Sequence, residues 1–510
     1  MKKIIVRDYK KIIIPILLVL INAGLIFSMK DSIGSRVLFI LPLLVIQLVV
    51  SFLALFFWEK KGWKFHQLFL LVAIVTGLAY TFIMPLGSVP DERNHFRRAY
   101  EISGLHFTSE IDPATGIGGR ILPSSIDAAF GSPDEEAKGY PYSDFVENFS
   151  PSVQDDTREW QNFGNTSLYS PFVYIPQAIG IDIGRILHLP MFAIVYLARI
   201  FNLIFWIILG YYIIRFIPFG KGIAFLLLFM PTSMQAAASC QADAVANVTA
   251  VALFTYVLYK IKTPRAISKK DYVLSSALAI LVSMSKIVYL PLCFLLYLLP
   301  AKMFKSKKHK FVSISLVIAA AVLLNFIWLL ISSRYLSAEF QAGVNTSEQV
   351  GFIISHPLGF LQAIFRTIIG NGNFYFFTFF GSSLSWLNIN LAEPYILAFA
   401  FYAFYTYLRE SQKNFSLDNQ QKFYIFLSVS VCVLLIFASL YIQWTSVAAP
   451  VVAGIQGRYF IPVALPLMFL LPTLSKDNKD KSNSFEPQII SVSLALTVYA
   501  LAAYMCHFLA

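Results

Sequence analysis

The sequence predicts an all-α protein that crosses a membrane several times. Of its 510 residues, 57% are hydrophobic and 13% are charged, whereas soluble domains carry about 25% charged residues. Apolar runs of about 18 residues or more recur along most of the chain, and each is long enough to cross the hydrocarbon core of a bilayer. Basic residues gather in the short connections between these runs, as is typical of cytoplasmic loops. We therefore expect a multi-pass protein of the cell (plasma) membrane with its amino terminus in the cytoplasm.

The apolar runs predict about 13 transmembrane helices. In chain order the expected spans are about 12–28, 36–57, 66–86, 189–214, a hairpin around the outer turn 239–243, two short helices within 272–300, then 311–332, 390–408, 423–442, 459–474 and 487–508. This number of crossings puts the Lys-rich connections 260–270 and 302–310 on the same side as the amino terminus.

Polar stretches divide the chain into five parts. These are the first helices in 1–86, an extracytoplasmic cap with a juxtamembrane helix in 87–188, further helices in 189–332, a second extracytoplasmic segment with an interfacial helix in 333–388, and the last helices in 389–510. The segment 87–188 is too long for a simple turn, and it holds most of the acidic residues and many aromatic ones. Because the aromatic residues offer apolar surface to bury, we expect a small ordered cap.

The net charge of +12 does not indicate a nucleic acid partner. Most of the 40 Lys and Arg residues fall in the expected cytoplasmic loops, and most of the 28 acids fall on the other side. The basic excess therefore sets the topology and contacts anionic membrane lipids.

The cysteines and histidines predict neither a disulfide framework nor a zinc site. The four cysteines lie in or near expected helices without a Cys-x-x-Cys pair, and they are Cys240, Cys293, Cys432 and Cys506. The seven histidines are scattered. We expect no obligatory metal or other cofactor, with a divalent cation left open as an alternative.

A dense group of charges directly follows the third expected span, in residues 88–100. Ser88 suits a helix N-cap and Gly104 suits a helix stop, so the sequence predicts a short juxtamembrane helix over about 90–103. Asp91, His95 and Arg98 would then share one face of that helix. An acid, an imidazole and a guanidinium together could serve proton transfer and phosphate binding. The alternative is structural, with Asp91 as a capping acid and the basic groups on lipid phosphates.

Other ionisable residues stand where membrane proteins rarely tolerate them. Asp243 lies at the outer turn of a helix hairpin, Lys286 interrupts an apolar run, and Arg458 directly precedes an expected span. Such residues are functional candidates by default. Capping for Asp243 and snorkelling of the two cations to head groups are the structural alternatives. Arg199, inside an expected helix, is predicted to be a structural partner for a buried acid.

Motifs for other chemistry are absent from the sequence. It contains no Gly-x-x-x-x-Gly-Lys loop for ATP, no Gly-x-Ser-x-Gly and no His-Glu-x-x-His.

Several motifs in fixed order resemble a bacterial membrane family known as domain of unknown function 2142. The matching segments are Val89–Glu92 with His95 and Arg98–Tyr100, Tyr169–Gln177, Ala198–Asn202, Met230–Pro231 with Gln235 and Asp243, Lys286 with Tyr289, and Gln456–Pro462. They cover roughly residues 66–475. That family is in turn similar to integral-membrane glycosyltransferases of the GT-C fold, which use polyprenyl-phosphate-linked sugars.

The resemblance implies that Asp91 corresponds to the acidic catalytic position of those enzymes, with Glu92 beside it. One departure is that three expected helices precede Asp91 here, where many such enzymes have one. The resulting hypothesis is a GT-C-like glycosyltransferase that transfers a sugar from a polyprenyl-phosphate donor to an extracytoplasmic cell-surface glycan or polymer. Asp91 would be the general base. Arg98, Lys286 and Arg458 would bind the donor phosphate.

Further residues are expected to contact substrate near this centre. They are His95, Tyr169, Gln241, Asp243, Gln456 and Tyr459. Two alternatives stay open. A transporter or flippase of lipid-linked saccharides would need charges near the bilayer midplane and discontinuous helices, and a glycan ligase or polymerase would differ mainly in the size of the donor.

Overall fold

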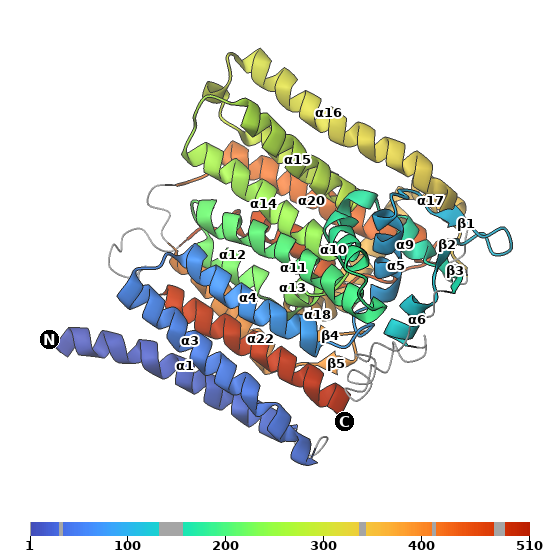
Figure 1. Ribbon diagram of the computed structural model, residues 1–510. Coiled ribbons are helices and arrows are strands. Elements are labelled where there is room, and N and C mark those ends of the chain that lie inside the picture. The colour runs from blue at the N-terminus through green and yellow to red at the C-terminus, as the bar shows by residue number, and fades with distance from the viewer. Residues whose placement is uncertain are drawn as a thin grey trace.

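Helices make up most of the described chain, and the long ones run side by side (Figure 1). The computed structural model describes residues 2–29, 34–131, 157–335, 343–410, 415–473 and 485–509. Within the described chain, eight helices are long and apolar enough to cross a membrane, or up to nine if one bent pair counts as a single span. The eight are α1 (Lys2–Ser28), α3 (Leu41–Lys61), α4 (Phe65–Ile83), α11 (Met191–Phe216), α14 (Asp243–Lys262), α16 (Lys307–Ser332), α20 (Asn419–Gln443) and α22 (Glu486–Leu509).

The all-α membrane architecture is thus confirmed, but the expected count of about 13 spans is not. Several expected spans are shorter elements, namely α12 (Lys221–Leu228) with α13 (Pro231–Ala237), α15 (Lys269–Ser285), η3 (Ile287–Leu298), α19 (Glu393–Arg409) and α21 (Ile461–Met468). Prolines are one reason, because a proline removes a backbone donor and clashes with the preceding turn. Pro231 starts α13, Pro291 lies inside η3, and Pro466 lies inside α21.

Part of the expected cap is ordered around a small sheet at one end of the long helices (Figure 1). Its described elements are α5 (Glu92–Ser103), β1 (Glu110–Ile111), β2 (Gly118–Pro123), α6 (Ser125–Phe130), β3 (Arg158–Asn162), α9 (Gly164–Ser167), η2 (Pro171–Tyr174) and α10 (Ile175–Ile186). The strands pair antiparallel in the order β1-β2-β3, with Arg120 opposite Gln161. Residues 132–156, which carry several of the expected cap's acids and aromatics, lie outside the described residues.

The second polar segment is also built near the cap. Its bent pair, α17 (Thr346–Ser355) and α18 (Pro357–Phe380), turns by 105° at the break between the two helices. A two-stranded hairpin of β4 (Ser383–Leu384) and β5 (Ile389–Asn390) follows. The remaining elements are the short helices η1 (Gly34–Phe39), η4 (Ala301–Met303), η5 (Ser333–Tyr335) and η6 (Gly457–Phe460).

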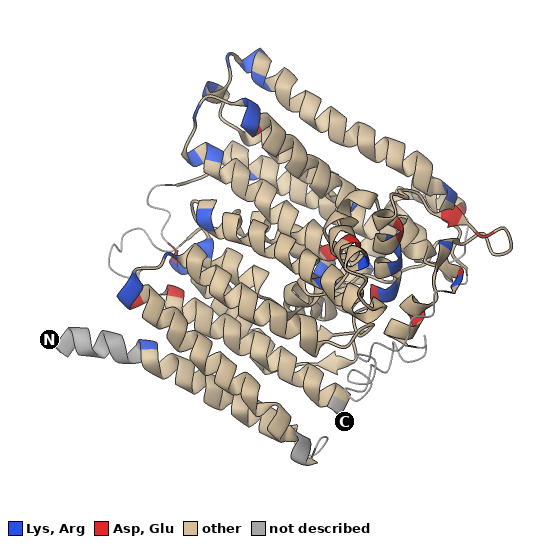
Figure 2. Ribbon diagram, viewed as in Figure 1, with Lys and Arg blue, Asp and Glu red and all other residues tan. Residues whose placement is uncertain are grey.

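Charge separates along the direction of the helices. At the helix ends away from the cap, Lys and Arg predominate, and the middles of the helices carry few charges (Figure 2). The cap carries charges of both signs, including most of the described acids (Figure 2). All four cysteines are buried and none is in a disulfide. The separation gives the molecule a basic end and a cap end, each of which has a cavity.

Candidate functional site

Asp91 stands at the start of α5 in an unusual backbone conformation. Its φ of 60° and ψ of 11° place it in the left-handed region, which only a few per cent of non-glycine residues adopt. The expected helix over 90–103 with Ser88 as N-cap is therefore corrected at its start: the helix begins at Glu92, and the Ser88 hydroxyl donates to Pro85 O. The predicted end is confirmed, since α5 stops at Ser103 before Gly104.

The Asp91 carboxylate does not cap the helix. It makes no capping hydrogen bond, and its Oδ1 accepts from Asn165 Nδ2 at 3.0 Å. The amide oxygen of Asn165, Oδ1, accepts from Asn94 Nδ2, also at 3.0 Å. The capping interpretation of Asp91 is therefore wrong, and the carboxylate is held by a cap residue that can orient it without neutralising it.

Burial raises the pKa of Asp91 above its ordinary value. The positive charges of Arg458 and Lys286 oppose this rise, as does the hydrogen bond from Asn165, whereas the negative charge of Asp243 adds to it. A carboxylate whose pKa is raised towards neutrality is a better proton acceptor than an ordinary aspartate.

Three charged side chains from distant parts of the chain meet beside Asp91. Lys286, at the break between α15 and η3, forms an ion pair with Asp243 at the start of α14, with Nζ 2.6 Å from Oδ1. Arg458, in η6, places Nε 3.9 Å from the other oxygen of Asp243. The structure thus brings together Asp91, Asp243, Lys286 and Arg458, which we call the charge cluster.

A tyrosine ring supports both cations of the charge cluster. Lys286 Nζ lies 4.8 Å from the centre of the Tyr459 ring, and the Arg458 guanidinium lies 5.5 Å from it. Lys286 also lies 5.8 Å from the ring of Tyr169. These contacts stabilise the cations through the ring faces. Among the described residues, Arg458 Nε is buried without a hydrogen-bond partner, and its ion pair with Asp243 is too long to be a hydrogen bond.

Gly457 lets η6 approach α18 closely enough to place Arg458. A Cβ at Gly457 would lie 2.2 Å from the backbone N of Phe379 and 2.2 Å from the backbone O of Tyr375. No other residue fits there without movement of the backbone. The Gly457 N–H also donates to Thr378 Oγ1 at 3.1 Å, which fixes the position of η6.

His95 lies near the charge cluster as a neutral imidazole. Its Nδ1 is 2.7 Å from the Tyr174 hydroxyl, and its ring packs edge-on to that of Tyr169. Burial lowers the pKa of His95 to about 3. His95 therefore adds no positive charge at neutral pH. From α5 its ring packs against that of Tyr169.

A cavity of about 290 Å³ opens beside the cluster. Asn165, Tyr169, Lys286 and Tyr459 line its polar end. Apolar side chains of η3, α16 and α20 line much of the rest, interrupted by polar ones such as Asn325, Ser439 and Gln443, and the apolar ones include Ile287, Trp328, Leu329, Ile436 and Leu440. Asp91 is not in the lining; Asn165, which holds its carboxylate, stands between the two. The cavity thus joins an apolar chamber to a polar and charged end.

Glu92 does not belong to the charge cluster, which corrects its expected catalytic role. Its fully buried carboxylate accepts from Arg199 Nε at 2.7 Å and from Arg199 Nη2 at 2.6 Å. The backbone N–H groups of Gly87 and Cys240 donate to it as well. Both oxygens are thus occupied and the side chain is closed off from the cavity beside Asp91, so Glu92 lies in a structural network. The prediction that Arg199 pairs with a buried acid is confirmed.

Arg98 is also removed from the expected phosphate site. Its side chain is fully buried and forms an ion pair with Glu101. It donates to Phe107 O at 2.8 Å and to Ser109 Oγ at 3.3 Å. Glu101, three residues further along the same helix, pairs with the guanidinium of Arg98, and the expected phosphate role did not take this pairing into account.

The remaining expected contacts are placed around the cluster. Gln241 Nε2 donates to Pro90 O at 2.8 Å and so supports the turn before Asp91. Gln456 precedes η6, where its carbonyl accepts from the Tyr459 N–H. Asn165 was missed by the sequence reasoning, because nothing in its polar surroundings shows that α9 folds back onto the start of α5.

Among the described residues, no group of three or more His, Cys, Asp or Glu side chains could hold a metal ion. Neither a curated protein nor a solved structure matches the chain. One family model does match, over residues 71–467, which is most of the chain and includes every residue of the charge cluster. The chain therefore belongs to the family described as "Predicted membrane protein (DUF2142)".

Proposed function

We propose that this protein is an integral-membrane glycosyltransferase. It would transfer a sugar from a polyprenyl-phosphate-linked donor to a cell-surface glycan or polymer on the extracytoplasmic face. The observation that carries the proposal is the position of Asp91, a half-buried carboxylate with a raised pKa, near the two cations Lys286 and Arg458. A largely apolar cavity opens beside them, and Lys286 and Asn165 line it.

The donor phosphate would bind to Lys286 and Arg458. A phosphodiester needs charge-assisted donors, and a guanidinium fits phosphate oxygens well. Arg458 Nε has no hydrogen-bond partner among the described residues, so it would donate to a phosphate oxygen without breaking a hydrogen bond, while its longer ion pair with Asp243 would weaken. Asp243 holds Lys286 in place and limits the repulsion between the two cations while the donor is absent.

The reaction needs one proton acceptor and one stabilised leaving group. Asp91 would take the proton of the acceptor hydroxyl while that oxygen bonds to the anomeric carbon of the sugar. The bond between the anomeric carbon and the phosphate oxygen would break, and polyprenyl phosphate would leave with the electron pair. Lys286 and Arg458 would stabilise the negative charge that develops on the phosphate.

The apolar wall of the cavity fits the hydrocarbon tail of such a donor. α16 and α20 supply much of that wall, and the outer faces of both helices are apolar and exposed. The lipid would therefore enter sideways from the bilayer. With the basic helix ends in the cytoplasm, the cap and the cluster would face outwards.

The two cations supply positive charge where a nucleotide donor would need a metal, so we propose no obligatory metal. Transfer should be unchanged within about twofold after EDTA treatment and metal-free dialysis of the purified protein. Loss of transfer that Mg²⁺ or Mn²⁺ restores would show that a cation is part of the site.

A transporter or flippase of lipid-linked saccharides is the second candidate. The break between α15 and η3 at Lys286 favours it, because discontinuous helices commonly line substrate sites in transporters. A ligase or polymerase of preassembled glycans would use the same cluster with a larger donor.

The test is sugar transfer from a labelled polyprenyl-phosphate-sugar by the purified full chain in nanodiscs, with the Asp91→Asn variant. Asparagine tolerates the left-handed backbone at this position, so the variant should fold. The matched control is Asp182→Asn, which alters a half-exposed carboxylate of α10 in a weak ion pair. We expect Asp91→Asn to lose transfer about 100-fold or more and the control to keep it.

Full transfer by Asp91→Asn would remove Asp91 from the mechanism. If the wild-type protein moves the labelled lipid between leaflets without forming product, and Asp91→Asn does the same, the transporter is correct.

A further inference from the structure

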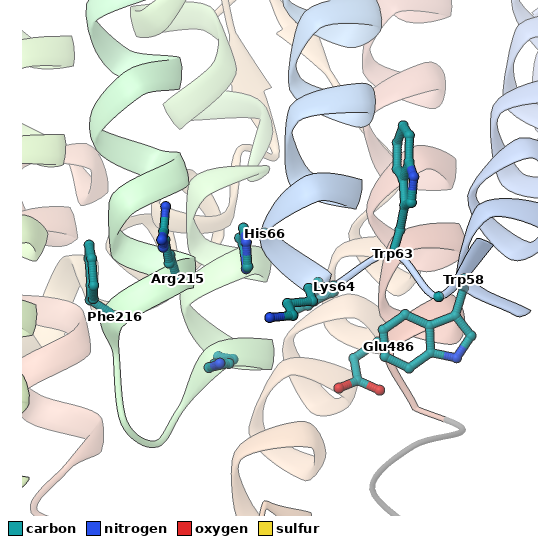
Figure 3. Close-up of a pocket in the computed structure, with 10 residues that line it drawn as sticks. Trp58, Trp63, Lys64, His66, Arg215, Phe216 and Glu486 are labelled. Carbon is teal, nitrogen blue, oxygen red and sulfur yellow. The ribbon is translucent and has the colours of Figure 1, made fainter.

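A second cavity lies at the basic end of the helices, away from the charge cluster. Its volume is about 690 Å³. Lys64, His66, Arg215, Lys221 and Glu486 line it together with the aromatic side chains of Trp58, Trp63, Phe65 and Phe216 (Figure 3). We call it the basic pocket. Nothing in the proposed transfer reaction uses it.

The ends of five helices build the basic pocket. α3 ends at Lys61, and Gly62 follows with a φ of 63°, so the chain turns sharply towards α4. The Lys64 N–H at the start of α4 donates to Gln67 Oε1 at 2.8 Å. This bond occupies the backbone of Lys64 and leaves its ammonium for the pocket. The end of α11 and the starts of α12 and α22 complete the walls.

Positive charge exceeds negative charge in this pocket. Three basic side chains, Lys64, Arg215 and Lys221, line it with one acid, Glu486. A second acid, Glu410, lies behind Lys221 outside the lining, where its oxygens accept from the backbone N–H groups of Gly220 and Gly222. Within the described part of the chain, neither ammonium group, of Lys64 or of Lys221, lies within ion-pair distance of an acid, and Glu486 and Glu410 attract Lys221 only over a longer distance. Cations that line one pocket repel each other unless an anion joins them. The pocket therefore suits an anion.

Arg215 is held in place without losing its charge. Its Nη1 donates to the Tyr211 hydroxyl at 3.3 Å, and its guanidinium lies 5.3 Å from the centre of the Phe216 ring. Neither partner is acidic. The group keeps donors for a ligand oxygen and is positioned by α11 itself.

The aromatic walls indicate an anion that belongs to a lipid. Trp58 and Trp63 stand on either side of the turn between α3 and α4 (Figure 3), and Trp63 stacks on Phe57 with ring centres 4.0 Å apart. Tryptophan side chains of this kind gather at the level of lipid head groups. The volume also far exceeds the space that an inorganic phosphate fills.

We infer that the basic pocket binds the phosphate head group of an anionic phospholipid from the leaflet at the basic end of the helices. Lys64, Arg215 and Lys221 would contact the phosphate oxygens, and the tryptophans would pack against the glycerol and the first carbons of the chains. Basic pockets between helices on the cytoplasmic side bind such head groups. The inference stands whether or not the protein transfers sugar.

The test measures lipid binding to the purified full chain in neutral detergent, by native mass spectrometry and by thermal melting. Phosphatidylglycerol should bind and raise the melting temperature, whereas phosphatidylcholine should do neither. The double variant Lys64→Gln with Lys221→Gln should bind phosphatidylglycerol about tenfold or more weakly. The control variant Lys307→Gln with Lys308→Gln makes the same charge change on exposed residues at the start of α16, outside the pocket, and should bind like the wild type.

Three results would overturn the inference. Equal binding of both lipids by the wild type would show that charge does not matter. Unchanged binding of phosphatidylglycerol by the pocket variant would place the lipid elsewhere. Displacement of the lipid by low-millimolar inorganic phosphate would indicate a soluble phosphate ligand. If the pocket variant melts early without lipid, the charge-keeping variant Lys64→Arg with Lys221→Arg replaces it and should retain binding.

Discussion

Asp91 and Glu92 are neighbours in the chain, yet their carboxylates belong to two different kinds of network. Glu92 lies in a closed network, where a fully buried ion pair with Arg199 and two backbone donors occupies both oxygens. Asp91 lies in an open network: among the described residues, Asn165 is the one hydrogen-bond donor to its carboxylate, and the nearby Arg458 Nε has no hydrogen-bond partner. The comparison separates a carboxylate that stabilises the fold from one that can react.

The closed network also explains why Asp91 is held where it is. Arg199 donates to the backbone oxygens of Thr81, Met84 and Pro85 in addition to Glu92. It therefore ties the end of α4 and the start of α5 to α11. The open network depends on this clamp for its geometry.

The largest expected effect is the loss of the clamp. Glu92→Gln should lower the free energy of unfolding by about 3–5 kcal/mol, because it leaves the buried Arg199 charge without its acid. Thermal melting or denaturant titration of the purified protein would measure this. Asp91→Asn should change the same quantity by less than about 1 kcal/mol. Equal losses in the two variants would show that both networks are structural.

The next largest effect is expected at Arg458, whose Nε has no hydrogen-bond partner among the described residues. Arg458→Gln should reduce kcat/KM for the lipid-linked donor by about 10- to 100-fold, the range expected for a lost charge-assisted hydrogen bond of about 1.5–3 kcal/mol. Arg458→Lys keeps the charge but not the fork of donors, so it should recover part of the loss. Steady-state kinetics over a range of donor concentrations would decide. No change in kcat/KM would exclude a contact between Arg458 and the donor.

A smaller effect should appear in the dependence of the rate on pH. Asp91 must be unprotonated to act as a base, so transfer should fall as the pH drops through its pKa, which burial raises above the usual value of about 4. Arg458 lowers that pKa. Arg458→Gln should therefore move the acid limb of the kcat profile to higher pH. A shift to lower pH would contradict the arrangement of charges around Asp91.

The smallest effect belongs to an exposed pair on the cap. Asp182 and Arg185 are 3.8 Å apart, and nearly half of each side chain is exposed. Asp182→Asn should change the free energy of unfolding by no more than about 0.5 kcal/mol, because water screens such pairs. A loss of several kcal/mol would mean that exposed ion pairs in this cap stabilise the fold as much as buried ones.

The sequence identified most charged residues of the two networks, but it did not show which residue pairs with which. Lys286 as a break in an apolar run, Asp243 at a turn and Arg199 inside a helix were all visible, because charge is costly in such places and needs a partner. The sequence could not predict which acid pairs with Arg199. Asp91 and Glu92 are adjacent acids, and the left-handed backbone at Asp91, which only the structure shows, directs them to different partners. Arg98 was misassigned for a similar reason, as its partner Glu101 competes with any ligand.

The number of membrane spans and the contact between Asn165 and Asp91 could not be predicted from the sequence either. Hydropathy measures whether a segment is apolar, but it does not separate a full span from short buried helices such as α12 and α13. Asn165 reaches Asp91 only because α9 folds back onto α5, and no spacing along the chain indicates this contact.

The most direct test of the account compares donor binding with turnover in one preparation of Asp91→Asn. If Asp91 is the base and the cations hold the phosphate, the variant should bind the polyprenyl-phosphate-sugar with a Kd within about threefold of the wild type, while kcat falls about 100-fold or more. A wild-type kcat in this variant would contradict the account.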